Sequence, residues 1–233
     1  GAGGSSRERT GEIASAVQNR WGLTSLAHLT CMGSSPSEIE GVMEKLEQEG
    51  VSNILALRGD PRPGEERADS PFSYAADLIR HIRKGHFRDF SIGAAAYPEG
   101  HPECASPEED LRHLREKTDA GADFLITQLF FDNEIFFRFM ENVRATGIAV
   151  PVLAGIMPVL NARQIGRIVA LCGASIPPKF ARIMSRYEHS PAALAEAGIA
   201  YATEQIIDLL SWGAEGIHLY TMNRPDVAER IMG

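Results

Sequence analysis

The sequence predicts a (β/α)8 barrel, an α/β fold in which parallel strands alternate with helices. Short apolar runs recur along the chain with helical patterns between them, and polar residues gather where the runs end. Apolar runs without polar alternation are typical of parallel strands that are buried on both faces. The chain has 233 residues, and such a barrel needs roughly 250. Because no Gly/Ser-rich linker divides the sequence, we expect residues 1–233 to form a single domain.

The apolar runs are the expected strands. Fewer such runs are visible than the eight of a closed barrel, and Gly1–Ser6 resembles the loop that follows a strand, so we expect the N-terminal strands to be missing from this chain. An open doubly wound sheet is the alternative. It is disfavoured because neither GxGxxG nor GxxxxGK[ST] occurs. The expected strands lie within Ser25–Cys31, Val51–Leu57, Phe90–Tyr97, Asp123–Phe130, Val150–Met157 and Gly216–Met222.

Helices are expected between these runs, and several carry end signals. Ser35-Pro-Ser-Glu38 has the residues of a capping box with proline at the first helical position, and Ser106-Pro-Glu-Glu109 repeats the pattern. Gly121 is expected to end the second of these helices. A long helix with one apolar stripe is expected from about Pro191 to Leu210.

Composition and charge restrict the class of protein. Hydrophobic residues make up 44% and charged residues 23%, which is ordinary for a globular chain. No apolar stretch is long enough to span a membrane, and no secretory leader is visible. The formal net charge of -8 disfavours binding to nucleic acid. The three cysteines, Cys31, Cys104 and Cys172, lie far apart without a CxxC motif, which disfavours a disulfide framework and suits the cytoplasm.

The polar residues at the strand ends are the candidate functional residues, because the carboxyl ends of barrel strands carry the chemistry. No nucleophile elbow, HExxH motif or Walker lysine accompanies them, and no tight ligand spacing suggests a metal site. Aromatic faces together with Arg58, His101 and Lys117 favour a large planar cofactor with a pyrophosphate. The candidates at the strand ends are His28, Thr30, Arg58, Gly59, Asp60, Tyr97, His101, Gln128, Tyr220, Asn223 and Arg224.

Ordered sequence blocks along nearly the whole chain resemble methylenetetrahydrofolate reductases. The blocks are His28–Cys31, Ala56–Asp60, Ala96–Pro102, Asp119–Ala122, Ile126–Asp132, Gly155–Pro158 and His218–Arg224. The resemblance implies an FAD-containing (β/α)8 barrel that reduces 5,10-methylenetetrahydrofolate to 5-methyltetrahydrofolate with NAD(P)H.

The resemblance also implies roles for individual residues. Asp60 and Gln128 are the expected catalytic residues. A carboxylate at Asp60 would disfavour the reduced anionic flavin and stabilise a cationic folate iminium, and the amide of Gln128 can read the pterin edge. Gln128, Gln164, Tyr220 and Arg224 are expected to contact the substrate. The expected flavin-binding residues are His28, Arg58, Gly59, Asp60, Tyr74, Ala75, Tyr97, His101, Asp110 and Lys117.

One feature of the family does not occur in this sequence. The family's catalytic glutamate belongs to a Glu-Phe-Phe-Pro-like segment on the first strand, and we expect that segment upstream of Gly1.

A non-catalytic flavin- or folate-binding homologue is the first alternative function, and a barrel lyase for a phosphorylated substrate is the second. We also expect a homo-oligomer without metal.

Overall fold

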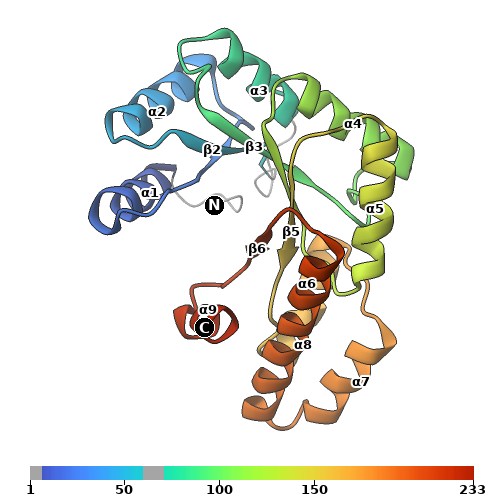
Figure 1. Cartoon of the computed structure of the whole chain (residues 1–233). Helices are drawn as coiled ribbons and strands as arrows, with labels where there is room; N and C mark the ends of the chain where they lie inside the picture. Colours follow the sequence, from blue (N-terminus) through green and yellow to red (C-terminus); the bar gives the residue numbers. More distant parts are fainter. Residues whose placement is uncertain (1–6, 60–70) are drawn as a thin grey trace. The chain divides into compact units, whose positions relative to one another are not determined.

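The computed structural model describes residues 7–59 and 71–233, and it divides into two compact units (Figure 1). Unit 1 comprises Gly1–Ala95 and Leu114–Leu125, and unit 2 comprises Ala96–His113 and Ile126–Gly233. Strands and helices alternate along the chain, and the strands follow one another in the sheet in chain order from β1 to β6. The strand pairs β1–β2, β2–β3 and β5–β6 are parallel. The predicted α/β class with a parallel sheet is therefore confirmed, whereas the single domain stays a prediction.

Unit 1 contains the first three strands, and each lies within its expected run. In the parallel pairing Ala27 lies opposite Ile54, and Asn53 lies opposite Ser91. Ile54 and Ile92 are completely buried in the core. The elements are α1 (Arg7–Trp21), β1 (Ala27–Thr30), α2 (Pro36–Gln48), β2 (Asn53–Leu57), α3 (Ala75–Lys84) and β3 (Ser91–Ala96), followed by the second half of α4 (Pro107–Asp119) and the start of β4 (Phe124–Thr127).

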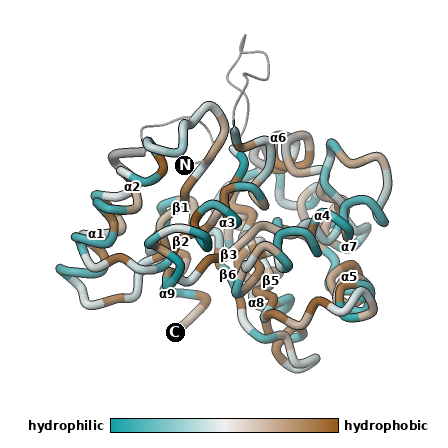
Figure 2. Tube along the Cα trace, turned by 90° about the horizontal axis from the view of Figure 1, so that it is seen from above, coloured by the Kyte–Doolittle hydropathy of each residue, from teal (hydrophilic) through white to brown (hydrophobic). Residues whose placement is uncertain are grey.

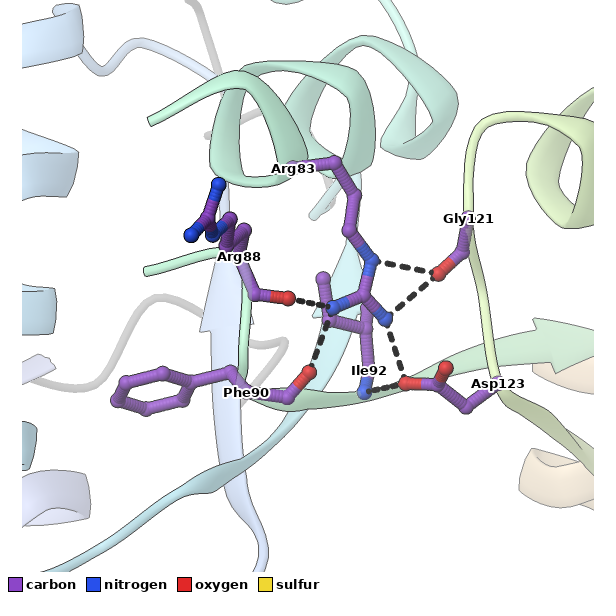
Figure 3. Close-up of polar contacts among 6 residues, drawn as sticks. All are labelled: Arg83, Arg88, Phe90, Ile92, Gly121 and Asp123. Carbon is purple, nitrogen blue, oxygen red and sulfur yellow. Dashed lines mark hydrogen bonds and ion pairs between the residues drawn. The ribbon is translucent and has the colours of Figure 1, made fainter. Parts of the chain in front are cut away.

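Arg83, near the end of α3, binds several backbone segments of unit 1 together (Figure 3). Its guanidinium donates two hydrogen bonds to Gly121 O, at 2.9 and 2.7 Å, and one to Phe90 O at 2.7 Å. It also binds Arg88 O and the carboxylate of Asp123, which in turn accepts from the Ile92 N–H. One side chain thus joins the end of α3 to the starts of β3 and β4.

Unit 2 packs its helices around an aromatic stack. The ring of Phe180 lies 4.9 Å from that of Phe131 and 4.4 Å from that of Tyr201, both in stacked geometry. Its strands pair in parallel, with Ala154 opposite Ile217. After the first half of α4 and the end of β4, its elements are α5 (Asn133–Ala145), β5 (Val152–Ile156), α6 (Ala162–Cys172), α7 (Pro178–Tyr187), α8 (Pro191–Trp212), β6 (Ile217–Leu219) and α9 (Pro225–Met232).

The helix-end signals have the expected effect. Ser35 Oγ accepts from the Glu38 N–H at 3.3 Å, and the Glu38 carboxylate accepts from the Ser35 N–H at 2.7 Å, which completes the capping box of α2. At α4, Ser106 Oγ accepts from the Glu109 N–H at 3.2 Å. The Glu109 carboxylate there accepts from Ala105 N–H rather than from Ser106, so the reciprocal bond is displaced by one residue.

The long helix expected from Pro191 is confirmed as α8, but it is not alone between β5 and β6. Helices α6 and α7 precede it, and α7 begins directly after Pro177. Figure 2 shows hydrophobic and hydrophilic residues along the same helices, as expected when one side packs in the protein and the other meets solvent. Within residues 7–59 and 71–233, no helix is both long enough and apolar enough to cross a membrane.

Candidate functional site

In unit 1, the residues that follow β1 and β2 are held together by backbone hydrogen bonds. Cys31 N–H donates to Leu57 O at 3.1 Å, and Met32 N–H donates to Arg58 O at 2.8 Å. The Cys31 side chain is completely buried, and its Sγ lies 3.7 Å from Arg58 O and 3.8 Å from Tyr74 O. This thiol brings the predicted residues Arg58 and Tyr74 to one place. Sequence reasoning gave Cys31 no role. A role would have been indicated only by the burial of its side chain after β1, which the structure reveals.

Gly59 has a backbone conformation that residues with a side chain rarely adopt. Its φ is +89°, which L side chains rarely adopt, and an added Cβ would lie 3.2 Å from Thr30 Cβ. The glycine therefore allows the chain after β2 to turn tightly against the end of β1. Asp60, the predicted catalytic carboxylate, lies outside the described residues.

His28, Tyr74 and Lys117 take distinct positions in unit 1. The side chain of His28 reaches solvent from β1, and desolvation by the surrounding protein is the largest cause that lowers its pKa. Tyr74 is 50% exposed and precedes α3, which starts at Ala75; its backbone N–H donates to the Asp77 carboxylate at 3.0 Å. Lys117 Nζ donates to Ala95 O at 2.7 Å, so an ammonium group lies at the end of β3.

In unit 2, the loop after β3 gathers Tyr97, His101 and Asp110. The rings of Tyr97 and His101 meet edge to face with centroids 4.6 Å apart. His101 N–H donates to Asp110 Oδ2 at 3.2 Å. Glu103 N–H donates to His101 Nδ1 at 3.1 Å, so the neutral ring carries its proton on Nε2. The three predicted residues thus form one cluster with a ring donor and a carboxylate acceptor.

Gln128 directly follows β4, as expected. Its backbone N–H donates to Ala96 O at 2.7 Å, and its side-chain oxygen accepts from the Leu129 N–H at 3.0 Å. This bond fixes the direction of the amide. Among the residues that the structure describes, none accepts a hydrogen bond from Gln128 Nε2. The group can therefore donate to a ligand.

Tyr220 follows β6, but its hydroxyl is used inside unit 2. It donates to Thr127 O at 2.9 Å, while Thr127 Oγ1 accepts from the Gly155 N–H at 2.8 Å. Burial is the largest cause that raises the pKa of Tyr220 to about 12. An added Cβ at Gly155 would lie 2.3 Å from Thr127 O and 2.9 Å from Tyr220 Cε2, so only glycine leaves room for this contact. We call Thr127, Gly155 and Tyr220 the strand-end lock.

Arg224 and Gln164 are the remaining substrate-side predictions. Arg224 lies exposed before α9 and forms two hydrogen bonds with the Asp226 carboxylate, at 3.0 and 2.8 Å. Gln164 belongs to α6, and its side chain lies outside the described part of the molecule. A separate hollow in unit 2 is lined by acidic residues together with Lys179 and Tyr201, and none of the predicted site residues lines it.

The site residues that sequence reasoning missed in unit 2 are Cys104 and His113. Cys104 Sγ lies 3.7 Å from Asp110 Oδ1 and 3.6 Å from His113 Nδ1. The i, i+3 spacing of Asp110 and His113 on α4 places them on one helix face and could have signalled the pair. No group of three or more His, Cys, Asp or Glu side chains suited to a metal ion is found in residues 7–59 and 71–233.

Solved structures support the fold class. A protein from Clostridium thermocellum, described as binding two copies of 5-methyl-5,6,7,8-tetrahydrofolic acid, matches with a TM-score of 0.55 and 14% identity over 93% of this chain and 75% of that one. A 2,3-dimethylmalate lyase matches with a TM-score of 0.51 and 17% identity over 99% of this chain and 75% of that one. At such identities the likeness concerns the fold alone, and it confirms the predicted barrel class.

Sequence comparison is more specific. Methylenetetrahydrofolate reductase (NADH) 1 of Arabidopsis thaliana is 38% identical over 235 residues, which are 96% of this chain and 40% of that protein. The 5,10-methylenetetrahydrofolate reductase of Escherichia coli (strain K12) is 35% identical over 231 residues, 99% of this chain and 76% of that protein. The chain thus spans about two fifths of the plant relative's length. The family model described as methylenetetrahydrofolate reductase matches residues 1–233, and the chain belongs to that family.

Proposed function

We propose that the protein reduces 5,10-methylenetetrahydrofolate to 5-methyltetrahydrofolate with NAD(P)H and bound FAD. Family membership supports the reaction, and the names of the relatives support a reduced nicotinamide as electron donor. The structural observation that carries the proposal is the cluster of Tyr97, His101 and Asp110 after β3. An aromatic ring, a ring N–H and a carboxylate suit a cofactor with a flat ring system, phosphates and a ribose.

The groups of unit 2 fit part of FAD. The Nε2–H of His101 can donate to a phosphate oxygen, because Nδ1 already accepts from Glu103 N–H. Asp110 accepts one backbone N–H and one thiol, so its oxygens retain acceptor capacity for ribose hydroxyls. FAD, when bound, supplies the two-electron carrier between nicotinamide and folate. The protein's part is to bind and orient it.

In unit 1, taken by itself, the predicted flavin-binding residues also have chemistry that suits FAD. Arg58 and Lys117 offer positive charge for a pyrophosphate, and the bond from Lys117 to Ala95 O fixes that charge at a strand end. Gly59 lets backbone approach closely, and the half-exposed ring of Tyr74 can cover the adenosine side with Ala75. The imidazole of His28, whose pKa is lowered chiefly by desolvation, is a further candidate for contact with the flavin.

On the substrate side, Gln128 and Asp60 have the main roles in this proposal. The fixed amide of Gln128 donates through Nε2 to the pterin edge, and the Asp60 carboxylate stabilises positive charge on the folate iminium. Tyr220 acts by position, because its hydroxyl already binds Thr127 O. Arg224 would have to leave Asp226 to bind substrate, and Gln164 stays a candidate. The homo-oligomer and the cytoplasmic location also stay predictions.

A Gln128→Ala variant of the full-length protein tests the proposal. The wild type should purify with the absorption bands of FAD and form 5-methyltetrahydrofolate from NADH or NADPH. The variant should keep its flavin but show a folate KM about 10-fold higher, the effect of roughly one hydrogen bond. Gln48→Ala is the matched control, because Gln48 is exposed at the end of α2.

Three outcomes separate the alternatives. A wild type without flavin bands, even after addition of FAD, refutes the flavin proposal. Bound flavin without turnover of any folate shows a non-catalytic flavin-binding homologue. An unchanged folate KM in Gln128→Ala refutes the assigned role of the amide and leaves the reaction itself standing.

A further inference from the structure

The loop between β3 and α4 carries two of the residues proposed to bind FAD, Tyr97 and His101. They lie at the two ends of a tight turn, in which Gly100 N–H donates to Tyr97 O at 3.0 Å and Gly100 has a φ of +87°. The turn brings the rings of Tyr97 and His101 together, with centroids 4.6 Å apart. We call residues 97–101 the flavin turn. Glu99 lies inside the turn, between these two rings along the chain.

The carboxylate of Glu99 binds a segment of unit 2 that is distant in the sequence. Both of its oxygens accept from the Ser175 N–H, Oε1 at 3.0 Å and Oε2 at 2.9 Å, across 76 positions. Ser175 belongs to residues 173–177, which connect α6 to α7 and which we call the α6–α7 segment. A Cβ added at Gly173 would lie 3.7 Å from Pro102 Cγ, so the segment also comes close to the residue that follows the flavin turn.

The α6–α7 segment has a well-defined position of its own. Ala174 is buried in the core of unit 2. Pro177 and Pro178 follow one another, and each proline ring fixes the backbone φ. Two residues later, the buried ring of Phe180 stacks on that of Phe131 with centroids 4.9 Å apart. The N–H donor of this segment is therefore held by the packing around it, and the flavin turn takes its position from that donor.

We propose that Glu99 is a positioning residue for FAD, because it holds the flavin turn against the α6–α7 segment. Both carboxylate oxygens face the Ser175 N–H, so Glu99 acts through Tyr97 and His101. The turn has a second support on α4, where Asp110 accepts from His101 N–H. When the bond of Glu99 is lost, FAD has to order the turn as it binds, and this ordering lowers the affinity. The inference rests on the proposed binding of FAD by Tyr97 and His101.

Glu99→Ala and Glu99→Gln in the full-length holoprotein test the acceptor. Alanine removes both oxygens, whereas glutamine keeps one carbonyl oxygen at the same chain length. We expect the Kd for FAD, measured by flavin fluorescence, to rise about 10-fold in Glu99→Ala, as for one lost hydrogen bond. Glu99→Gln should stay close to the wild type. The activity of Glu99→Ala should be low at limiting FAD and recover as FAD is added.

Two further variants test the donor, and one controls for charge. Ser175→Pro removes the N–H and should bind FAD as weakly as Glu99→Ala, whereas Ser175→Ala keeps the N–H and should bind normally. Combining Ser175→Pro with Glu99→Ala should weaken binding no further, because both changes remove the same bond. If thermal melting shows that Ser175→Pro does not fold, the two Glu99 variants decide. Glu141→Ala removes one negative charge from the exposed side of α5 and should leave the Kd unchanged.

Hydrogen exchange in heavy water measures the bond independently of flavin binding. The Ser175 amide should exchange faster in Glu99→Ala than in the wild type. Unchanged exchange overturns the contact, and faster exchange with an unchanged Kd overturns the positioning role. An equal loss of affinity in Glu99→Gln, or a loss of activity that added FAD does not restore, also overturns it. A wild type that never binds FAD refutes the proposed function and this role together, and exchange at Ser175 then still decides whether Glu99 holds the turn.

Discussion

Replacement of Arg83 by methionine should be among the most destabilising single substitutions near the surface of unit 1. Methionine keeps an unbranched, flexible chain but removes every donor. The carbonyls of Gly121, Phe90 and Arg88 and the carboxylate of Asp123 then lose their shared partner. Arg83 is only 21% exposed, so water replaces these bonds incompletely.

The magnitude follows from the contacts. Each carbonyl hydrogen bond contributes about 0.5–1.5 kcal/mol net. The ion pair adds only about 0–1 kcal/mol, because the Asp123 side chain is 50% exposed. We therefore expect Arg83→Met to lower the free energy of unfolding by about 2–4 kcal/mol. Arg83→Lys retains the charge but cannot reach all the acceptors, and it should lose roughly half as much.

Urea denaturation followed by circular dichroism measures these differences. Arg80→Met is the matched control on the same helix, because Arg80 is 45% exposed and pairs with Asp77 one turn away. Its loss should be about 0.3–0.5 kcal/mol, the usual value for such a pair. If the free energies of unfolding of Arg83→Met and Arg80→Met differ by less than about 0.5 kcal/mol, Arg83 does not hold these segments together and the reasoning is wrong.

Three further predictions concern the strand-end lock and a helix cap. Gly155→Ala should destabilise the protein by more than about 2 kcal/mol in urea denaturation, because its Cβ would lie 2.3 Å from Thr127 O; an effect below that would show that β4 and β5 can shift apart. Burial in the folded protein raises the pKa of Tyr220 from its ordinary value of 10.0 to about 12. Its stabilisation should therefore fall as pH rises from 10.0 toward 12, and Tyr220→Phe should abolish that part of the pH dependence in thermal melts. Ser35→Ala removes the acceptor for Glu38 N–H and should cost about 0.5–2 kcal/mol, with Ser35→Thr close to wild type.

Local sequence signals predicted the parts of the fold that depend on neighbouring residues. The apolar runs identified all the described strands, and Ser35 with Glu38 marked the start of α2. Helices α6 and α7 were not predicted, because their sequences lack a capping box like that of α2. Pro178 at the start of α7 is an end signal, but it occurs without a capping box. For the candidate site, the position of Gln128 at the end of an apolar run and the family resemblance both indicated this residue, and the structure fixes its amide at the end of β4.

Contacts between distant residues could not be predicted. The Tyr220 hydroxyl reaches Thr127 across 93 positions of sequence, and nothing near either residue indicates the other. The family resemblance made Tyr220 a substrate contact, which stays a prediction, and the structure adds that its hydroxyl donates to Thr127 O. Cys104 and His113 were missed for a different reason: both lie near Asp110 in the sequence, but only the folded segment before α4 brings the Cys104 thiol to these two side chains.

The bond between Thr127 Oγ1 and Gly155 N–H also affects how fast the Gly155 amide of β5 exchanges its hydrogen with solvent. A strand amide normally exchanges its hydrogen with solvent when the backbone ladder separates, but this buried amide is protected by a side chain 28 residues away. Its exchange rate in heavy water therefore depends on rotation of the Thr127 side chain as well as on separation of the strands. A Thr127→Val substitution should deprotect Gly155 selectively, while neighbouring amides of β5 keep their slow exchange.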